Sequence, residues 1–170
     1  MAKAQDPIPM PLQDDVREIF GDLFGRGCTV EKTKDRIPFG PDQEEIVLGD
    51  FILDDGSVGA VVSADLAMAA YAGAALVMMP VGIAEEALSA GRIDGDMFDC
   101  FREVVNVMGR LLNRESTPHL RLRAIYRSGD ILPGQTRTML RQADRRKDFD
   151  VAIEEYGTGK LAIMVKGTAA

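Results

Sequence analysis

The sequence has few of the side chains that usually form metal, redox or nucleophilic sites, with one histidine and two cysteines among 170 residues. Cys28 and Cys100 are too far apart for a metal-ligand or redox motif. No secretion signal precedes them, so we expect free thiols in a reducing cytoplasm. His119 has no partner pattern for a metal or a catalytic triad, and no Walker-type phosphate loop occurs. We therefore expect the chain to bind no metal and no cofactor of its own.

Positive charge is also scarce, since 20 lysines and arginines face 27 aspartates and glutamates and give a net charge of -7. A chain of this charge is not attracted to phosphate backbones, so nucleic acid is not an expected partner. The stretch from Arg121 to Lys147 is an exception, because its basic residues outnumber its acidic ones. It is either a solvated basic face or a docking surface for an acidic protein.

One long hydrophobic run is present, at residues 66–84, and its length invites comparison with a membrane span. The run is rich in alanine and glycine, contains Pro80, and is bordered by Asp65 and Glu85 without basic anchors. These features favour a core helix that packs closely through small residues, and no contact with a membrane. With 46% hydrophobic and 28% charged residues, the chain is predicted to be a single globular domain over residues 1–170.

The first half of the sequence shows helical and strand periodicity between turn signals. The expected elements are a helix over 12–24, strands over 28–34, 46–53 and 57–63, a small-residue helix ending near 80, and a short helix over 84–90. Gly25 is the expected end of the first helix, and Asp55-Gly56 is a tight-turn signal. Ser63 is the expected N-cap of the small-residue helix.

The second half begins with a predicted helix over residues 96–113, followed by a strand over 119–127 and a looser segment. Strands are then expected over 148–156 and 160–165, with Gly157 and Gly159 as the turn formers between them. Both halves therefore share the order helix, strand, hairpin.

The leading helices of the two halves also share residues. "DDVREIFG" at 14–21 and "DCFREVVN" at 99–106 agree at the Asp, Arg and Glu positions. This match predicts two internal repeats, over roughly 12–80 and 95–166. Chance agreement of two amphipathic helices is the alternative. Where the second segment has Asn106, the first has Gly21.

A helical wheel of the second leading helix separates polar from apolar residues. One arc of about 100° holds Arg102, Asn113, Asn106, Asp99, Arg110 and Glu103. The opposite side is almost wholly apolar and is expected to pack on the sheet. Glu103 and Asn106 are one turn apart, so they project together. Periodicity alone makes this arc an ordinary solvated face.

The spacing Asp99-x-x-x-Glu103-x-x-Asn106 resembles the signature of the CheC, CheX and FliY family of chemotaxis phosphatases. The preceding segment, "GSVGAVVSADLAMAAYAGAALVMM", also resembles the family's segment before its catalytic helix, and the resemblance is clearest over residues 46–113. It implies an α/β (α+β) fold of two helix–strand–hairpin repeats, with a mostly antiparallel sheet packed with helices. Because the first repeat lacks the Asn, it implies one site, as in CheX, rather than two, as in CheC.

The resemblance also implies an activity, hydrolysis of the aspartyl phosphate of a CheY-like response regulator in chemotaxis or related two-component signalling. Asn106 is the candidate for holding the attacking water, since a carboxamide both donates and accepts hydrogen bonds. Glu103 would pair with a lysine of the regulator, which also carries the magnesium ion. Asp99, Arg102 and Arg110 are candidate substrate-binding residues on the same arc.

The alternative function is a non-catalytic CheX-like adaptor or switch-type binding module for a receiver domain. Flagellar switch proteins share this fold without the active pair, so the fold does not decide between the two functions. Under either function the expected partner is a CheY-like receiver domain, phosphorylated if the chain is a phosphatase. A homodimer is possible as well, because dimers occur among the relatives.

Overall fold

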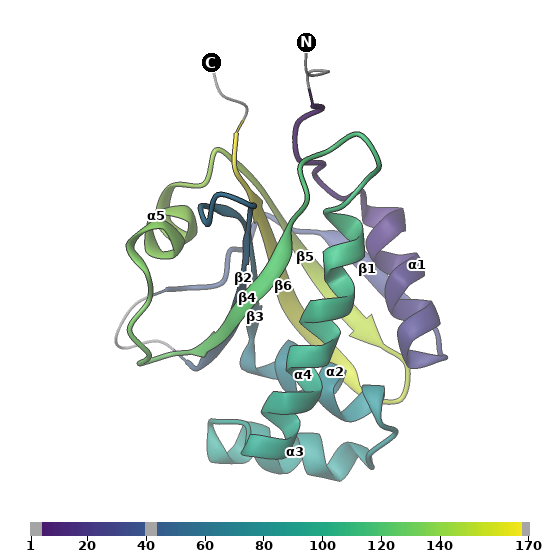
Figure 1. Cartoon of the computed structure of the whole chain (residues 1–170). Helices are drawn as coiled ribbons and strands as arrows, with labels where there is room; N and C mark the ends of the chain where they lie inside the picture. Colours follow the sequence, from purple (N-terminus) through teal and green to yellow (C-terminus); the bar gives the residue numbers. More distant parts are fainter. Residues whose placement is uncertain (1–4, 40–43, 168–170) are drawn as a thin grey trace.

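The sheet is the centre of the molecule (Figure 1), and it has six antiparallel strands in the order β1-β5-β6-β3-β2-β4. The strands are β1 (Cys28–Lys32), β2 (Ile46–Ile52), β3 (Val58–Asp65), β4 (Arg121–Arg127), β5 (Arg145–Ile153) and β6 (Gly157–Val165). The computed structural model describes residues 5–39 and 44–167, so the ends of the predicted domain of 1–170 lie outside the described residues.

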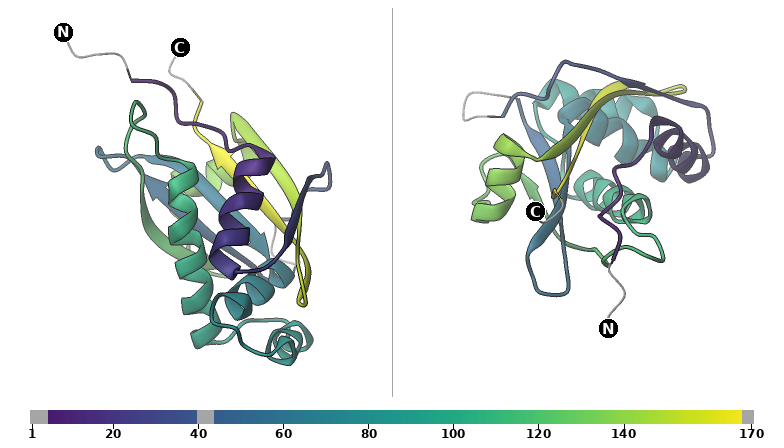
Figure 2. Two further views of the ribbon diagram at one scale, coloured as in Figure 1. Left: turned by 90° about the vertical axis from the view of Figure 1, so that its right-hand side faces the viewer. Right: turned by 90° about the horizontal axis from the view of Figure 1, so that it is seen from above.

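Helices cover both faces of the sheet. They are α1 (Gln13–Phe24), α2 (Leu66–Leu76), α3 (Val81–Ala90), α4 (Gly95–Met108) and α5 (Gly134–Gln142), with a 3-10 turn, η1 (Gly109–Leu111), after α4. Seen from above in Figure 2, α5 lies on one side of the sheet and α1 and α4 lie on the other. The predicted α+β class with a mostly antiparallel sheet is confirmed.

The two faces of the sheet build two apolar clusters, because successive residues of a strand point to opposite sides. In β2, Val47 and Phe51 belong to the cluster that contains residues of α1, α2 and α4, whereas Ile46, Leu48 and Ile52 belong to the cluster that contains Leu140 of α5. Every residue of β2 is buried, including the charged Asp50. The strand is therefore covered on both sides.

Asp50 is fully buried on the α5 face and is surrounded by hydrogen-bond donors. Its carboxylate accepts hydrogen bonds from Thr136 Oγ1 at 2.8 Å and from the hydroxyl of Tyr126 at 3.2 Å, and it forms an ion pair with Arg123. A buried charge is tolerated when it is paired and hydrogen-bonded in this way. The network ties β2, β4 and α5 together.

The strand order is symmetric with respect to the two halves of the chain. Exchanging β1 with β4, β2 with β5 and β3 with β6 reverses the order and leaves every neighbour relation intact. Each half thus gives its first strand to the hairpin of the other half, and β3 and β6 pair with each other at the centre. This arrangement is compatible with the predicted repeats, which stay a prediction.

Gly157 and Gly159 are not turn residues, contrary to the sequence prediction. Both belong to β6, and the turn consists of residues 154–156, where Tyr156 N donates to Ile153 O at 3.0 Å and Glu155 has a φ of 70°. A Cβ at Gly159 would lie 2.3 Å from the backbone nitrogen of Met68 in α2. The glycine therefore lets the small-residue helix rest directly on the sheet.

The boundaries of several elements differ from those predicted. Asp65, not Ser63, caps α2, because its Oδ1 accepts from Met68 N at 2.8 Å while Ser63 is buried within β3. The helix ends at Leu76 rather than near Pro80. The looser segment contains α5, a helix that we did not predict. None of the helices in the described residues is both long enough and apolar enough to cross a membrane.

Candidate functional site

The candidate site lies on α4, whose apolar side is fully seated in the core. Five residues of the helix are buried and fix its rotation: Met97, Phe101, Val104, Val105 and Met108. α4 runs close to α2, since a Cβ at Gly73 would lie 3.0 Å from Met97 O. The direction of the polar face is thus set by the core.

The first turn of α4 is also held in place. Asp94 caps the helix, with its Oδ1 accepting from Met97 N at 2.8 Å. The guanidinium of Arg127, from β4, donates to Ile93 O at 2.7 Å and stacks over the ring of Phe98 at 4.4 Å. A helix anchored at its start and along its length presents its exposed side chains at a defined place.

Four of the five predicted site residues share the exposed face of α4. Asp99, Arg102, Glu103 and Asn106 are all exposed. Within residues 5–39 and 44–167, no hydrogen bond or ion pair engages the side chain of Glu103 or Asn106. Residues three apart on a helix have their Cβ atoms about 5–6 Å apart, so a carboxylate and a carboxamide stand side by side in solvent. Both groups are available to a partner.

The fifth residue, Arg110, lies beyond the end of α4, in η1. The predicted helix over 96–113 is therefore too long, and the helical wheel does not describe the direction of Arg110. Its side chain lines a groove of about 340 Å³ between η1 and α1. Asp15, Glu18 and Asp22 form the acidic wall of this groove.

The α1 side of this groove was not predicted as part of the site. Glu18 corresponds to Glu103 when "DDVREIFG" is laid on "DCFREVVN", so the repeat alignment contained the signal. Glu18 and Arg110 line the same groove, whereas Gly21 occupies the position that matches Asn106. Only the α4 copy combines the Glu with the Asn.

Asn113, which the wheel placed on the polar arc, has a structural role. Its side-chain amide donates to Gly109 O at 3.1 Å and to Leu120 O at 2.8 Å, and its Oδ1 accepts from Leu120 N at 2.8 Å. The side chain thus joins the end of η1 to the residue before β4. It is not free to bind a substrate.

Cys100 lies beside the polar face and is half-buried. Burial raises the pKa of its thiol, and the negative charges of Asp96, Asp99 and Asp94 raise it further. A thiol with a raised pKa is a weak nucleophile at neutral pH. The described residues contain no group of three His, Cys, Asp or Glu side chains placed to hold a metal ion.

The predicted basic stretch of residues 121–147 does not form one patch. Arg123 pairs with Asp50, Arg127 holds the start of α4, and Arg145 donates to Ile8 O at 2.6 Å and to Lys166 O at 2.9 Å. These three side chains bind groups of the protein itself. Arg121, Arg137 and Arg141 are exposed, and the role of the stretch as a solvated face or as a docking surface for an acidic protein stays a prediction.

Comparison with known proteins finds solved structures with a similar fold. No protein-family model and no curated protein matches the sequence. A crystal structure of the FliM–SpeE complex from H. pylori matches with a TM-score of 0.60 at 9% identity, covering 91% of this chain and 81% of that one. The FliM middle domain from H. pylori matches with a TM-score of 0.54 at 10% identity, covering 91% and 84%.

The CheX–CheY–BeF3–Mg complex from Borrelia burgdorferi is similar at a TM-score of 0.47 and 8% identity, covering 88% of this chain and 92% of that one. The two FliM structures, with TM-scores above 0.5, show that this chain shares their fold. The α+β fold with an antiparallel sheet packed with helices, which the sequence resemblance implied, is therefore confirmed, and it is similar to the fold of the FliM structures.

Proposed function

We propose that the chain is a protein phosphatase that accelerates hydrolysis of the aspartyl phosphate on a CheY-like receiver domain. One observation carries the proposal. Glu103 and Asn106 lie side by side in solvent on a helix whose other side is buried in the core. No side chain of the described residues forms a hydrogen bond or ion pair with either of them. An exposed pair of this kind fits a substrate that is itself a folded protein. Such a substrate implies a cytoplasmic location.

Asn106 supplies the chemical role of the site. Phosphoryl transfer to water depends mainly on the placement of the water in line with the leaving group and on stabilisation of the charge on phosphorus. A carboxamide can accept a hydrogen bond from the water and donate another to a phosphoryl oxygen. Its place on a firmly seated helix reduces the entropy lost when the water is aligned.

Glu103 serves recognition in this proposal. A carboxylate next to a phosphoryl group would be repelled unless a cation stood between them. A lysine of the receiver domain provides that cation, so Glu103 fixes how the two proteins dock. The magnesium ion belongs to the receiver. Asp99 and Arg102 lie on α4 beside Glu103 and Asn106, and in this proposal they contact the receiver domain around the pair. Arg110 contacts the receiver domain from the groove between η1 and α1.

A receiver-binding module without catalysis is the second candidate. The FliM structures match with TM-scores above 0.5, and flagellar switch proteins share the fold that the sequence resemblance implies without having the active pair. In a module of this kind, Glu103 and Asn106 contribute to binding, and the rate at which the partner loses its phosphate does not change.

The experiment compares phosphate loss from a magnesium-loaded, phosphorylated receiver domain with and without the chain. Asn106→Ala is expected to keep binding and to lower the acceleration by about tenfold to a hundredfold, because it removes a group that acts on the transition state. Glu103→Ala is expected to weaken binding. Gln142→Ala on α5 and Glu86→Ala on α3 are matched controls, because both side chains are exposed and lie on helices other than α4. Neither substitution is expected to change binding or the acceleration of phosphate loss.

The outcomes separate the two candidates. Acceleration by the wild type that is lost in Asn106→Ala supports the phosphatase. Tight binding by the wild type without any acceleration, for each receiver domain of the source organism, refutes catalysis and supports the binding module. Loss of acceleration in the control variants to the same degree would show that the α4 pair is not the site.

A further inference from the structure

A basic hollow lies where β1 ends and its neighbour β5 extends beyond it. Lys32 is the last residue of β1 and lies opposite Phe149, after which Thr33 N donates to Asp148 O at 3.0 Å. The first residues of β5, 145–147, pair with β6 on one side but extend beyond β1 on the other. The sheet edge is therefore open here, and a hollow of about 440 Å³ lies along it.

The hollow is lined by seven residues, of which five are basic: Lys32, Thr33, Lys34, Arg36, Arg146, Lys147 and Asp148. The basic residues come from two distant parts of the chain, the end of β1 with its following loop and the start of β5. Five cations and one carboxylate leave an excess of four positive charges. Such a concentration stands out in a chain with a net charge of -7.

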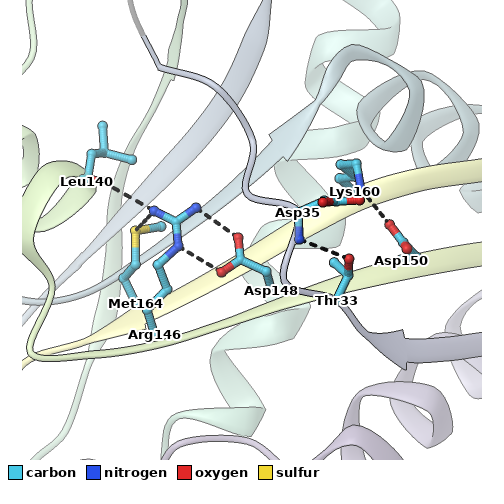
Figure 3. Close-up of polar contacts among 8 residues, drawn as sticks. All are labelled: Thr33, Asp35, Leu140, Arg146, Asp148, Asp150, Lys160 and Met164. Carbon is cyan, nitrogen blue, oxygen red and sulfur yellow. Dashed lines mark hydrogen bonds and ion pairs between the residues drawn. The ribbon is translucent and has the colours of Figure 1, made fainter.

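The one carboxylate of the hollow already has its cation. Arg146 donates to both oxygens of Asp148, from Nε at 2.9 Å and from Nη2 at 2.8 Å, and both side chains are nearly buried (Figure 3). Arg146 also donates to Leu140 O at 3.3 Å. Because this pair is closed, Asp148 does not neutralise the remaining cations.

Neighbouring acidic groups are also engaged or stand outside the hollow. Asp150 pairs with Lys160 at 2.9 Å (Figure 3). Asp35, between Lys34 and Arg36 in the chain, and Asp15 do not line the hollow. In the described part of the chain, the charged groups of Lys32, Lys34 and Arg36 have no hydrogen bond and no ion pair. These three side chains are exposed.

Lys147 shows the effect of this crowding. Its Nζ donates to Pro11 O at 3.2 Å, so the ammonium is held near the hollow. Burial lowers the pKa of Lys147, the positive charge of Lys32 lowers it further, and the negative charge of Asp15 opposes these two effects in part. An anion placed between the two lysines would relieve this repulsion.

The open edge also provides one main-chain donor, the N–H of Arg146. In an antiparallel pair, residues two apart in a strand direct their N–H and C=O groups to the same neighbour. Since Asp148 O faces the β1 side, the N–H of Arg146 points to that side as well, beyond the end of β1. Backbone N–H groups next to lysine and arginine form a common setting for phosphate oxygens.

We propose that this basic hollow binds a small anion that carries at least two phosphate groups. An excess of four positive charges matches two phosphates better than one. The volume lies within the range of about 300–1,000 Å³ that is usual for small-molecule sites. An acidic peptide added as a strand is a poorer fit, because the free edge spans three residues and a strand of average length has about five or six.

The test titrates the full chain with pyrophosphate, tripolyphosphate, inorganic phosphate and a hexaglutamate peptide at fixed ionic strength, by calorimetry. Pyrophosphate and tripolyphosphate are expected to bind with one-to-one stoichiometry and at least about tenfold more tightly than inorganic phosphate, because each added charge-assisted contact contributes. Affinity is expected to fall as salt rises. The amide resonances of Arg146 and Lys147 are expected to shift on binding.

The matched variants each remove three exposed positive charges. Lys32→Gln/Lys34→Gln/Arg36→Gln is expected to weaken pyrophosphate binding by about tenfold or more, whereas Arg92→Gln/Arg121→Gln/Arg141→Gln, at exposed positions elsewhere, changes it by less than about twofold. Equal weakening in both variants would mean attraction by overall charge and would overturn the site. No binding of pyrophosphate by the wild type, or tighter binding of hexaglutamate than of tripolyphosphate, would overturn it too.

Discussion

The side-chain amide of Asn113 forms hydrogen bonds with both main-chain groups of Leu120, at 2.8 Å each. These two bonds close the loop that leads from η1 to β4, and a third, to Gly109 O, fixes the amide itself. The relationship matters for the candidate site because it ties the end of the helical segment that carries Glu103 and Asn106 to the sheet.

We expect Asn113→Asp to destabilise the protein by about 1–3 kcal/mol, because it removes two donated hydrogen bonds at half-buried carbonyls and places a charge beside them. Asn106→Asp is the matched control, since the same chemical change at an exposed position leaves no partner unpaired. Urea unfolding measures both. Equal stability of the two variants would contradict a structural role for Asn113.

The close approach of Gly159 to Met68 gives a prediction about packing. Gly159→Ala places a Cβ 2.3 Å from the backbone of α2, so the helix must move, and we expect a loss of about 1–3 kcal/mol. Gly82→Ala, in α3, meets no atom within 4 Å and is expected to be neutral or slightly stabilising. Thermal unfolding of the two variants compares them directly, and a tolerated Gly159→Ala would be inconsistent with this packing.

The ion pair between Asp50 and Arg123 is unequally buried, with 0% and 32% of the side chains exposed. Arg123→Met leaves a fully buried carboxylate without its cation, whereas Asp50→Asn leaves an arginine that water reaches. We therefore expect the first change to cost about 3 kcal/mol and the second about 1 kcal/mol. Chemical denaturation measures the difference, and the opposite order would show that the arginine, not the aspartate, depends on the pair.

The duplication can be tested at Gly21, where the first repeat lacks the Asn of the second. A Cβ at Gly21 has Arg26 O at 3.8 Å, an ordinary contact, so Gly21→Asn is expected to fold with equal or slightly higher stability. If the phosphatase proposal holds, this change in an Asn106→Ala background is expected to restore part of the acceleration through Glu18. Restoration that persists when Glu18 is also changed to Ala would count against a second Glu–Asn pair.

Cys100 reports on the electrostatics beside the candidate site. Because burial and three aspartates raise its pKa, less thiolate is present at any pH near neutrality, and alkylation of a Cys28→Ala variant is expected to be slower than that of a free cysteine. Asp96→Asn/Asp99→Asn should lower the pKa and speed alkylation, whereas Glu85→Gln/Glu86→Gln should not. Iodoacetamide rates across pH give the pKa, and an unchanged value in the first variant would argue against the charge effect.

Local sequence patterns were sufficient to predict the structure where it depends on contacts between residues close together in the chain. α1 ends at Gly25, which has the left-handed φ of 63° that favours glycine, as the sequence predicted. The apolar side of α4 was likewise readable from its spacing, because five residues of that side are buried. The exposure of Glu103 and Asn106 followed from the same periodicity.

Predictions failed where contacts between distant segments decide the role of a residue. Gly157-Thr158-Gly159 has the composition of a turn, yet its glycines serve the approach of α2, which the local sequence does not encode. Asn113 fitted the helical wheel only because the wheel continued past the change to a 3-10 turn at Gly109. The basic hollow joins Lys32 and Lys34 to Arg146, and that meeting depends on the pairing of β1 with β5.

The strand order also sets the sequence of events during synthesis. β1 leaves the ribosome long before β5, yet β5 is its neighbour in the sheet, and Cys28 lies opposite Ile153. The hairpin of β2 and β3 can form at once, whereas β1 and the helix α1 behind it must wait until β5 has been synthesised. Pairing between such distant segments is slow, so the nascent N-terminal half is the part most exposed to chaperones and proteases.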